Sequence, residues 1–149
     1  YFPLGTYANK LGRLAGDALL GKPAGYNRAL GTVMLRVLGM EFAKTGLTEA
    51  EAKAAGIEAK SVLVRAHSHP HYYPDACDID IKLCYRAEDR VLLGAQLMGE
   101  RDTAIRIDPI AVAIDQGMTT DELGFADFGY APPFAGSWDA IAVAANAAK

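Results

Sequence analysis

The chain has 149 residues, of which 51% are hydrophobic, and its 15 basic and 18 acidic residues give a net charge of -3. This length suits one principal packed domain with a short appended element. Because neither sign of charge collects into a long run, the composition argues against nucleic-acid and membrane-surface partners. Charges or glycines interrupt every apolar stretch before it reaches the ~20 residues of a membrane helix.

The two cysteines, Cys77 and Cys84, fall within one predicted strand at an odd separation. Alternate residues of a strand share a face, so these two side chains point to opposite faces and are expected to remain free thiols. Free thiols are typical of a reducing, cytoplasmic environment. The chain carries no signal-peptide pattern and begins at Tyr1 in a loop-like stretch, so we expect it to be part of a longer protein.

Residues 1–31 form a section of their own. Apolar residues recur there at spacings of three and four, which predicts one amphipathic helix closed by Gly21; they are Leu11, Leu14, Ala15, Ala18 and Leu19. The following segment, KPAGYNRALG at 22–31, contains Pro23, two glycines near it and Asn27, and is predicted to be a linker.

From residue 32 the pattern changes to strands. The segment TVMLRVLGMEFAKTG at 32–46 predicts two short strands that meet at Gly39. Thr48 and Glu51 then form a capping box, which opens a helix that Gly56 should end. Three further strands are predicted at 58–67, 77–86 and 91–98. In the second of these, apolar and charged residues alternate, which indicates one buried and one solvent-exposed face.

The last part of the chain is predicted to be helical. Residues 103–118 suit one helix with Pro109 in or near its first turn. Thr119 and Glu122 make a second capping box. GYAPPFAG at 129–136 is expected to be rigid and extended, and an alanine-rich helix follows from about Trp138. Together these elements predict an α+β domain, an antiparallel sheet with helices packed on one face.

All three histidines of the chain lie in one short cluster, His67, His69 and His71. In an extended strand these alternate residues share a face, where three imidazoles could bind Zn²⁺ or Cu²⁺. Pro70 instead favours a strand end or edge. We favour a polar strand end beside an interface, assign no metal ligand, and keep a His-rich metal-binding module as an alternative.

Two tyrosine-proline segments, HYYPDA at 71–76 and GYAPPFAG at 129–136, lie outside the predicted regular elements. Tyrosine beside proline is often amphipathic packing. Rigid connections on a scaffold are also where binding and catalytic residues concentrate. The chain contains no G-x-G-x-x-G, no P-loop and no CxxC, so an independent dinucleotide-binding enzyme is not expected.

Five segments resemble, in this order, the C-terminal part of flavoprotein disulfide reductases with a single reactive cysteine. They are PLGTYANKLGRLAG at 3–16, HYYPDA at 71–76, LLGAQLMGERDTAIRID at 92–108, GMTTDEL at 117–123 and GYAPPFAG at 129–136. The chain is thereby similar to the dimerisation domain of the pyridine nucleotide-disulfide oxidoreductase family, above all to its coenzyme A disulfide reductases, persulfide reductases and NADH oxidases.

The resemblance implies a domain boundary. Residues 1–31 would be the tail of an FAD-binding domain, its last helix and a linker, and 32–149 the dimerisation domain. It implies a homodimer whose subunits also contain flavin and pyridine-nucleotide domains, with FAD and NAD(P)H bound by the full-length enzyme and neither by these residues alone. The substrate would be a small thiol or disulfide such as coenzyme A.

The resemblance also implies roles for particular residues. Tyr72 and Tyr130 would reach across the dimer to the partner's reactive cysteine, and their phenols, with ordinary pKa values of about 10, would stay protonated near neutral pH. Tyr73 is expected to pack inward. The start of the first helix would present N–H donors to the flavin, at Leu4, Gly5, Thr6 and Ala8.

Asn9 and Arg13 lie one helical turn apart and either face a coenzyme A-like substrate or form an exposed polar stripe. The sequence thus predicts the interface portion of a coenzyme A disulfide or persulfide reductase that is inactive by itself. A water-forming NADH oxidase of the same architecture is the first alternative. A free-standing metal-binding or dimerisation module is the second.

Overall fold

The computed structural model describes residues 3–26 and 28–149 and divides the chain into two compact units, Tyr1–Gly31 and Thr32–Lys149. Tyr1, Phe2 and Asn27 lie outside the described residues, and with them part of the expected opening loop and part of the expected linker. The assignment of the first unit to an FAD-binding domain remains a prediction.

The first unit contains the helix α1, Gly5–Leu19. As expected, the helix ends before Gly21, which has a φ of 70° and donates its N–H to the carbonyl of Ala18 at 3.0 Å. Tyr7 is buried, and its hydroxyl accepts the N–H of Gly31 at 2.7 Å. The predicted apolar stripe is largely uncovered, because Leu11 and Leu19 are 48% and 90% exposed.

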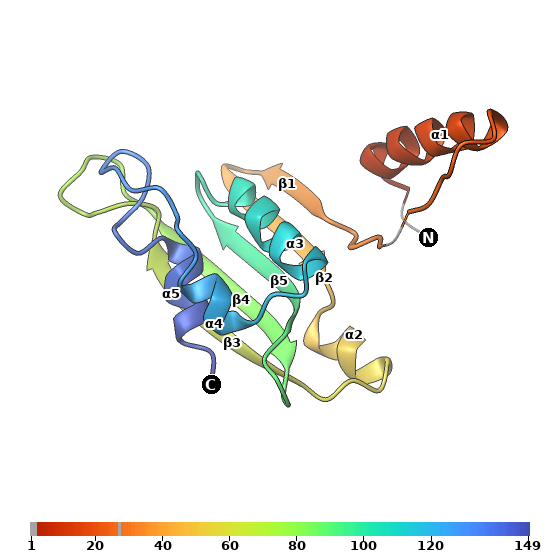
Figure 1. Cartoon of the computed structure of the whole chain (residues 1–149). Coiled ribbons are helices and arrows are strands. Elements are labelled where there is room, and N and C mark those ends of the chain that lie inside the picture. The colour runs from red at the N-terminus through yellow and green to blue at the C-terminus, as the bar shows by residue number, and fades with distance from the viewer. Residues whose placement is uncertain (1–2, 27) are drawn as a thin grey trace. The chain divides into compact units, whose positions relative to one another are not determined.

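The second unit is built on an antiparallel sheet (Figure 1). Its described strands form five in the order β1-β2-β5-β4-β3, with bounds β1 Val33–Val37, β2 Met40–Gly46, β3 Ala59–His67, β4 Asp78–Arg86 and β5 Leu92–Gly99. All five predicted strands are therefore confirmed. The turn between β1 and β2 uses Leu38 and Gly39, both with positive φ, as a two-residue hairpin turn requires.

Short helices complete the unit. Both capping boxes are present, so Thr48 and Thr119 each accept the N–H three residues on. Pro109 sits in the first turn of its helix, where a missing N–H costs no hydrogen bond. The described helical segments are α2 Glu49–Ala54, the 3₁₀ turn η1 Ala104–Arg106, α3 Ile107–Asp115, α4 Thr120–Gly124 and α5 Ala140–Asn146.

The core lies between one face of the sheet and α3, α4 and α5, which Figure 1 shows in front of it. Ile79, Ile81 and Leu83 on β4 are fully buried, whereas the alternating Asp80 and Lys82 point to the opposite face. This is the predicted alternation, and it confirms an α+β fold with the helices on one side of the sheet.

The expectation for residues 129–136 is wrong. Ala131 and Ala135 form an isolated bridge, and the N–H groups of Phe134 and Ala135 both donate to the carbonyl of Ala131, at 2.9 and 3.0 Å. The segment is therefore a tight turn. The φ that a proline ring imposes suits a turn as well as an extended chain, and the two prolines lose no bond there because the donors come from the residues after them.

Candidate functional site

Two connections meet at one end of the sheet. The β3–β4 connection, residues 68–77, and the α4–α5 connection, residues 125–139, lie side by side in Figure 1. They bring Tyr72 and Tyr130 together, so that the two hydroxyl oxygens are 3.3 Å apart. We call these two side chains the tyrosine pair. Its members were predicted from the sequence as site residues, and the structure places them in direct contact.

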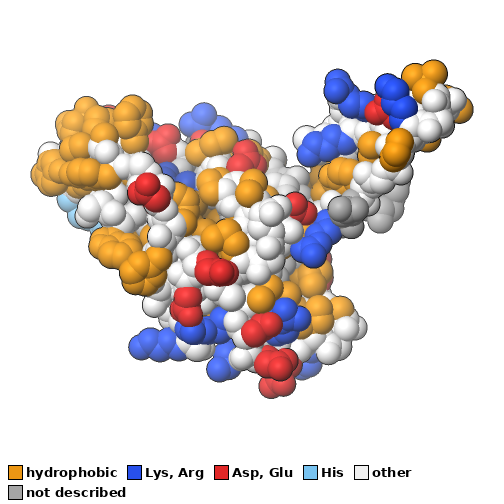
Figure 2. All heavy atoms as spheres, viewed as in Figure 1, with side chains coloured by type: hydrophobic (Ala, Val, Ile, Leu, Met, Phe, Trp, Pro, Cys, Tyr) orange, Lys and Arg blue, Asp and Glu red, His pale blue; other side chains and the backbone are white. Residues whose placement is uncertain are grey.

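The tyrosine pair is open to solvent. Tyr72 is 74% exposed and Tyr130 is 54% exposed, and Figure 2 shows hydrophobic side chains gathered at this end of the molecule. Other exposed aromatic residues of the same two connections are Tyr73, Phe125, Phe134 and Trp138. Exposed apolar side chains gathered at one end of a molecule suit contact with another protein surface or a ligand.

The electrostatics of the tyrosine pair favour a protonated phenol at Tyr72. The hydrogen bond with Tyr130 raises the pKa of Tyr72, with smaller contributions from desolvation and from charge repulsion by Tyr130. Each phenol has one proton to donate. When one hydroxyl donates to the other, the second hydroxyl still has its own proton, which is available to an acceptor outside the pair. Such a pair suits the recognition of a thiolate or another soft anion.

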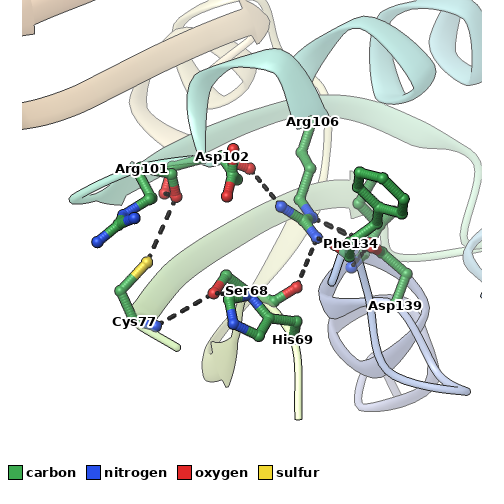
Figure 3. Close-up of polar contacts among 10 residues, drawn as sticks. Ser68, His69, Cys77, Arg101, Asp102, Arg106, Phe134 and Asp139 are labelled. Carbon is green, nitrogen blue, oxygen red and sulfur yellow. Dashed lines mark hydrogen bonds and ion pairs between the residues drawn. The ribbon is translucent and has the colours of Figure 1, made fainter. Parts of the chain in front are cut away.

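A buried ion pair lies beneath the two connections (Figure 3). The Nε of Arg106 donates to the carboxylate of Asp139 at 3.1 Å, and the two side chains are only 8% and 10% exposed. The guanidinium also donates to three main-chain carbonyls, those of Ser68, Asp102 and Phe134. Sequence reasoning missed Arg106, although a charged residue between the apolar residues of TAIRIDPIAV was a usable signal for a buried partner.

The histidine cluster is divided between two environments. His69 is buried, with Nδ1 at 3.0 Å from the Ser68 hydroxyl and Nε2 at 2.9 Å from the carbonyl of Pro74. Its ring packs edge-on against Tyr73, which nevertheless remains 39% exposed and so is not packed inward as expected.

His67 and His71 face each other instead. Their Nε2 atoms are 2.8 Å apart, and the Nδ1 of His67 lies 2.9 Å from a carboxylate oxygen of Asp78. Because β3 ends at His67 and the chain then bends, the three imidazoles do not share a face. Among residues 3–26 and 28–149, no three His, Cys, Asp or Glu side chains converge to hold a metal ion. The three-histidine arrangement is therefore not formed.

The remaining predicted residues lie on α1. Its first turn carries no acidic residue in the part of the chain described, and Leu4 precedes it as an N-cap without a capping side chain. The N–H of Ala8 donates to the carbonyl of Leu4 at 3.0 Å, so it is already engaged within the helix. Gly5 and Thr6 come earlier in the first turn, where helix N–H groups lack partners inside the helix. Asn9 and Arg13 are exposed.

Both cysteines are free, as predicted. Cys84 is buried, and burial raises the pKa of its thiol, which keeps it protonated and unreactive. A reactive cysteine is therefore not assigned to Cys84. Cys77 precedes β4, and its thiol donates to the carbonyl of Arg101 at 3.4 Å.

The sheet face opposite the helices holds a shallow apolar depression of about 500 Å³. It is lined by apolar side chains of β1, β2, β3 and β5, together with Lys44, Asp80 and Lys82. The apolar lining includes Val33, Leu35, Phe42, Leu63 and Met98. Within the parts described, no helix is long and apolar enough to span a membrane.

Comparison with known proteins gives a consistent family. Residues 35–142 match the family model described as pyridine nucleotide-disulphide oxidoreductase, dimerisation domain. The chain is 38% identical, over its whole length, to the NAD(P)H coenzyme A polysulfide/persulfide reductase of Pyrococcus horikoshii, and covers 33% of that protein. It is 28% identical to an NADH oxidase of Enterococcus faecalis, over 99% of this chain and 33% of the relative.

Among solved structures, the chain resembles an NAD-dependent persulfide reductase from A. fulgidus with a TM-score of 0.93 and 35% identity, covering 97% of this chain and 27% of the other. The chain spans about a third of the length of the curated relatives that it matches.

Proposed function

The chain belongs to the pyridine nucleotide-disulphide oxidoreductase family, of which it carries the dimerisation domain, and we propose that it serves a cytoplasmic, homodimeric reductase of coenzyme A disulfide or persulfide. The observation that carries the proposal is the contact between Tyr72 and Tyr130, two exposed phenols that come from separate connections. The substrate class is supported by the Pyrococcus horikoshii relative, which is named a coenzyme A polysulfide/persulfide reductase.

The tyrosine pair would assist the departure of sulfur. Reductive cleavage of a disulfide takes two electrons and releases two thiolates, which acquire two protons. A phenol that hydrogen-bonds to the leaving sulfur stabilises its developing negative charge. The raised pKa of Tyr72 keeps its hydroxyl protonated for this purpose. In the dimer that we propose, the pair would act at the partner subunit's reactive cysteine.

The first turn of α1 fits an anionic partner such as a reduced flavin. With no acidic residue there, the partial positive charge of the helix end is not compensated. Leu4, Gly5, Thr6 and Ala8 are the residues that would border FAD, with the N–H groups of Gly5 and Thr6 as the donors. In the full-length enzyme, NAD(P)H would supply hydride and FAD would pass electrons to the reactive cysteine.

Substrate contacts are proposed for the exposed face of α1. Asn9 and Arg13 are exposed and one turn apart, so an amide and a guanidinium could together bind a phosphorylated ligand such as coenzyme A. The uncovered sheet face is proposed to contact the flavin and pyridine-nucleotide domains of the same polypeptide, because an apolar depression of this size is otherwise a liability in water.

The test is made in the full-length protein with Tyr72→Phe and Tyr130→Phe. Each variant is expected to lower turnover of coenzyme A disulfide by about 10-fold or more, because proton donors typically contribute ~10²-fold or more and the second phenol remains. Tyr73→Phe is the matched control, since it removes a phenol from the same connection without touching the pair. Wild-type turnover in both single variants and in the double variant would exclude the proposed role.

A water-forming NADH oxidase is the second candidate, and the Enterococcus faecalis relative, which is named an NADH oxidase, supports an oxidase of this architecture. The two activities differ in the electron acceptor. Oxygen consumption and disulfide reduction by the same full-length preparation, measured at equal NAD(P)H concentration, separate them. We expect disulfide or persulfide reduction to be the faster reaction, whereas oxygen consumption unaffected by added disulfide would favour the oxidase.

A further inference from the structure

We propose that Arg106 is a positioning residue for the tyrosine pair, because its guanidinium ties together the two connections that carry Tyr72 and Tyr130. The inference rests on the proposed role of the pair and extends it to a residue that touches neither phenol. Arg106 itself is anchored in η1, directly before α3, and α3 packs its buried residues against the sheet.

Each connection is bonded to the guanidinium close to its tyrosine (Figure 3). The Nη2 atom donates to the carbonyl of Ser68 at 2.8 Å, four residues before Tyr72. The same atom donates to the carbonyl of Phe134 at 3.1 Å, four residues after Tyr130. One planar group thus fixes the separation between the two main chains from which the phenols extend.

The C-terminal end of the α4–α5 connection is held by Asp139, which forms the ion pair with Arg106. Asp139 accepts from the Nε of Arg106 at 3.1 Å and also accepts the N–H of Ile141 at 2.9 Å, which caps the start of α5. A displaced guanidinium would therefore release the carbonyl contacts and loosen this cap together. Since the ion pair is buried, breaking it also leaves an uncompensated charge.

Apart from the contact of the tyrosine pair, the other hydrogen bonds of the described residues in the two connections do not join one connection to the other. The Nε2 of His69 bonds to the Pro74 carbonyl, and the Ala131 carbonyl accepts the N–H groups of Phe134 and Ala135. These bonds fix the local shape of each connection but not the distance between the two connections. The contact of the tyrosine pair, at 3.3 Å, is long for a bond between hydroxyls, for which 2.7 to 2.8 Å is usual. A contact this long contributes little to holding the two connections together. We therefore assign their spacing to the hydrogen bonds that Arg106 donates to both of them.

Lysine cannot replace arginine here. The guanidinium offers donors in a rigid plane and uses them on four separate residues, whereas an ammonium is a compact point charge with three donors. Arg106→Lys therefore keeps the charge beside Asp139 and loses the simultaneous bonds to Ser68 and Phe134. Arg86→Lys is the matched control, because Arg86 forms an exposed ion pair with Asp89 at the other end of β4.

The experiment is a kinetic double-mutant cycle on the full-length holoenzyme. Arg106→Lys is introduced into wild type and into the Tyr72→Phe, Tyr130→Phe double variant, and turnover of coenzyme A disulfide is measured. In wild type the substitution is expected to lower turnover by about 10-fold to 100-fold, the effect of displacing a reacting group by about 1 Å. In the double variant its further effect should be less than about twofold, because contacts that act as one unit are not additive.

The outcomes separate the two proposals. If Arg106→Lys lowered turnover by the same factor in the wild type and in the double variant, the positioning role would be overturned. Unchanged turnover after Arg106→Lys alone would overturn it as well. Turnover at the wild-type level in the Tyr72→Phe, Tyr130→Phe variant would overturn the proposed function and the inference with it. Circular dichroism and dimer size accompany each variant, and Asp139→Asn, which keeps the side-chain shape, is the second variant to be taken through the same cycle if Arg106→Lys does not fold.

Discussion

Tyr72 and Tyr130 are far apart in the sequence, and their contact depends on how two irregular connections fold. The sequence predicted that both belong to a site because the segments around them resemble those of the reductase family. Arg106 carried no such signal beyond its apolar neighbours. Its four partners come from the β3–β4 connection, the β5–η1 turn and the α4–α5 connection, and only the folded chain brings those three segments together.

The ionisation of Tyr72 can be measured directly. The hydrogen bond to Tyr130 raises the pKa of Tyr72 because it stabilises the protonated phenol. Because the pKa of Tyr72 is raised in the folded protein, the bond contributes its full stabilisation below the ordinary pKa of about 10. That stabilisation is lost as the pH rises through the higher pKa of the folded state. Tyr130→Phe should therefore return the pKa of Tyr72 toward its ordinary value.

The measurement is the tyrosinate absorbance of the protein as a function of pH, taken as the difference between each protein and its matched Tyr72→Phe variant. This difference isolates Tyr72 from the other phenols. The same titration midpoint with and without Tyr130 would mean that the two hydroxyls are not bonded in solution.

At the scale of elements, local signals were enough to place the strands and most helices. The two capping boxes and the alternation along β4 each act within a few residues, and each appears as predicted. The turn at 131–135 was missed because prolines permit both a turn and an extended chain, and the choice depends on which carbonyl receives the later N–H groups. Local sequence signals could not predict the strand order, because β5 pairs with β2, from which it is separated by a long stretch of sequence.

The junction of β2 and β5 offers a test of packing. Gly94 lies so close to the main chain of Leu47 that an added β-carbon would overlap the Leu47 carbonyl oxygen and lie 2.6 Å from its nitrogen. Because the obstacle is backbone, it cannot move aside without breaking strand pairing. Gly94→Ala is expected to lower the free energy of unfolding by about 1 to 3 kcal/mol, the usual cost of overpacking.

The free energy of unfolding in urea measures this effect. Gly25→Ala is the matched control, because Gly25 has open space around its β-carbon position and an unstrained φ. A Gly94→Ala protein as stable as the control would show that β2 and β5 are not packed as described.

At the scale of the whole molecule, the sequence indicated both the family and the fold class, because several of its motifs occur in the family's order. It could not show which surfaces remain open once the chain has folded. The exposed aromatic side chains of the β3–β4 and α4–α5 connections, and the apolar depression on the sheet face opposite the helices, are properties of the folded unit. We expect the exposed aromatic side chains to face the partner subunit and the apolar depression to face other domains of the same polypeptide.

The central claim is that the tyrosine pair of one subunit serves the reactive cysteine of its partner, and mixed dimers test it most directly. One full-length variant lacks the reactive cysteine, and the other carries Tyr72→Phe and Tyr130→Phe; each is impaired by itself. Co-expression with two different affinity tags allows the mixed dimers to be isolated. One of their two sites then combines an intact cysteine with an intact tyrosine pair from the other subunit.

Random pairing makes about half of the dimers mixed, so the unfractionated mixture should recover about a quarter of wild-type turnover and the purified mixed dimer about half. Recovery to these levels is the predicted result. If the pair instead served the cysteine of its own subunit, no site in a mixed dimer would be intact. Turnover in the purified mixed dimer no higher than the mean of the two parent variants would contradict the account.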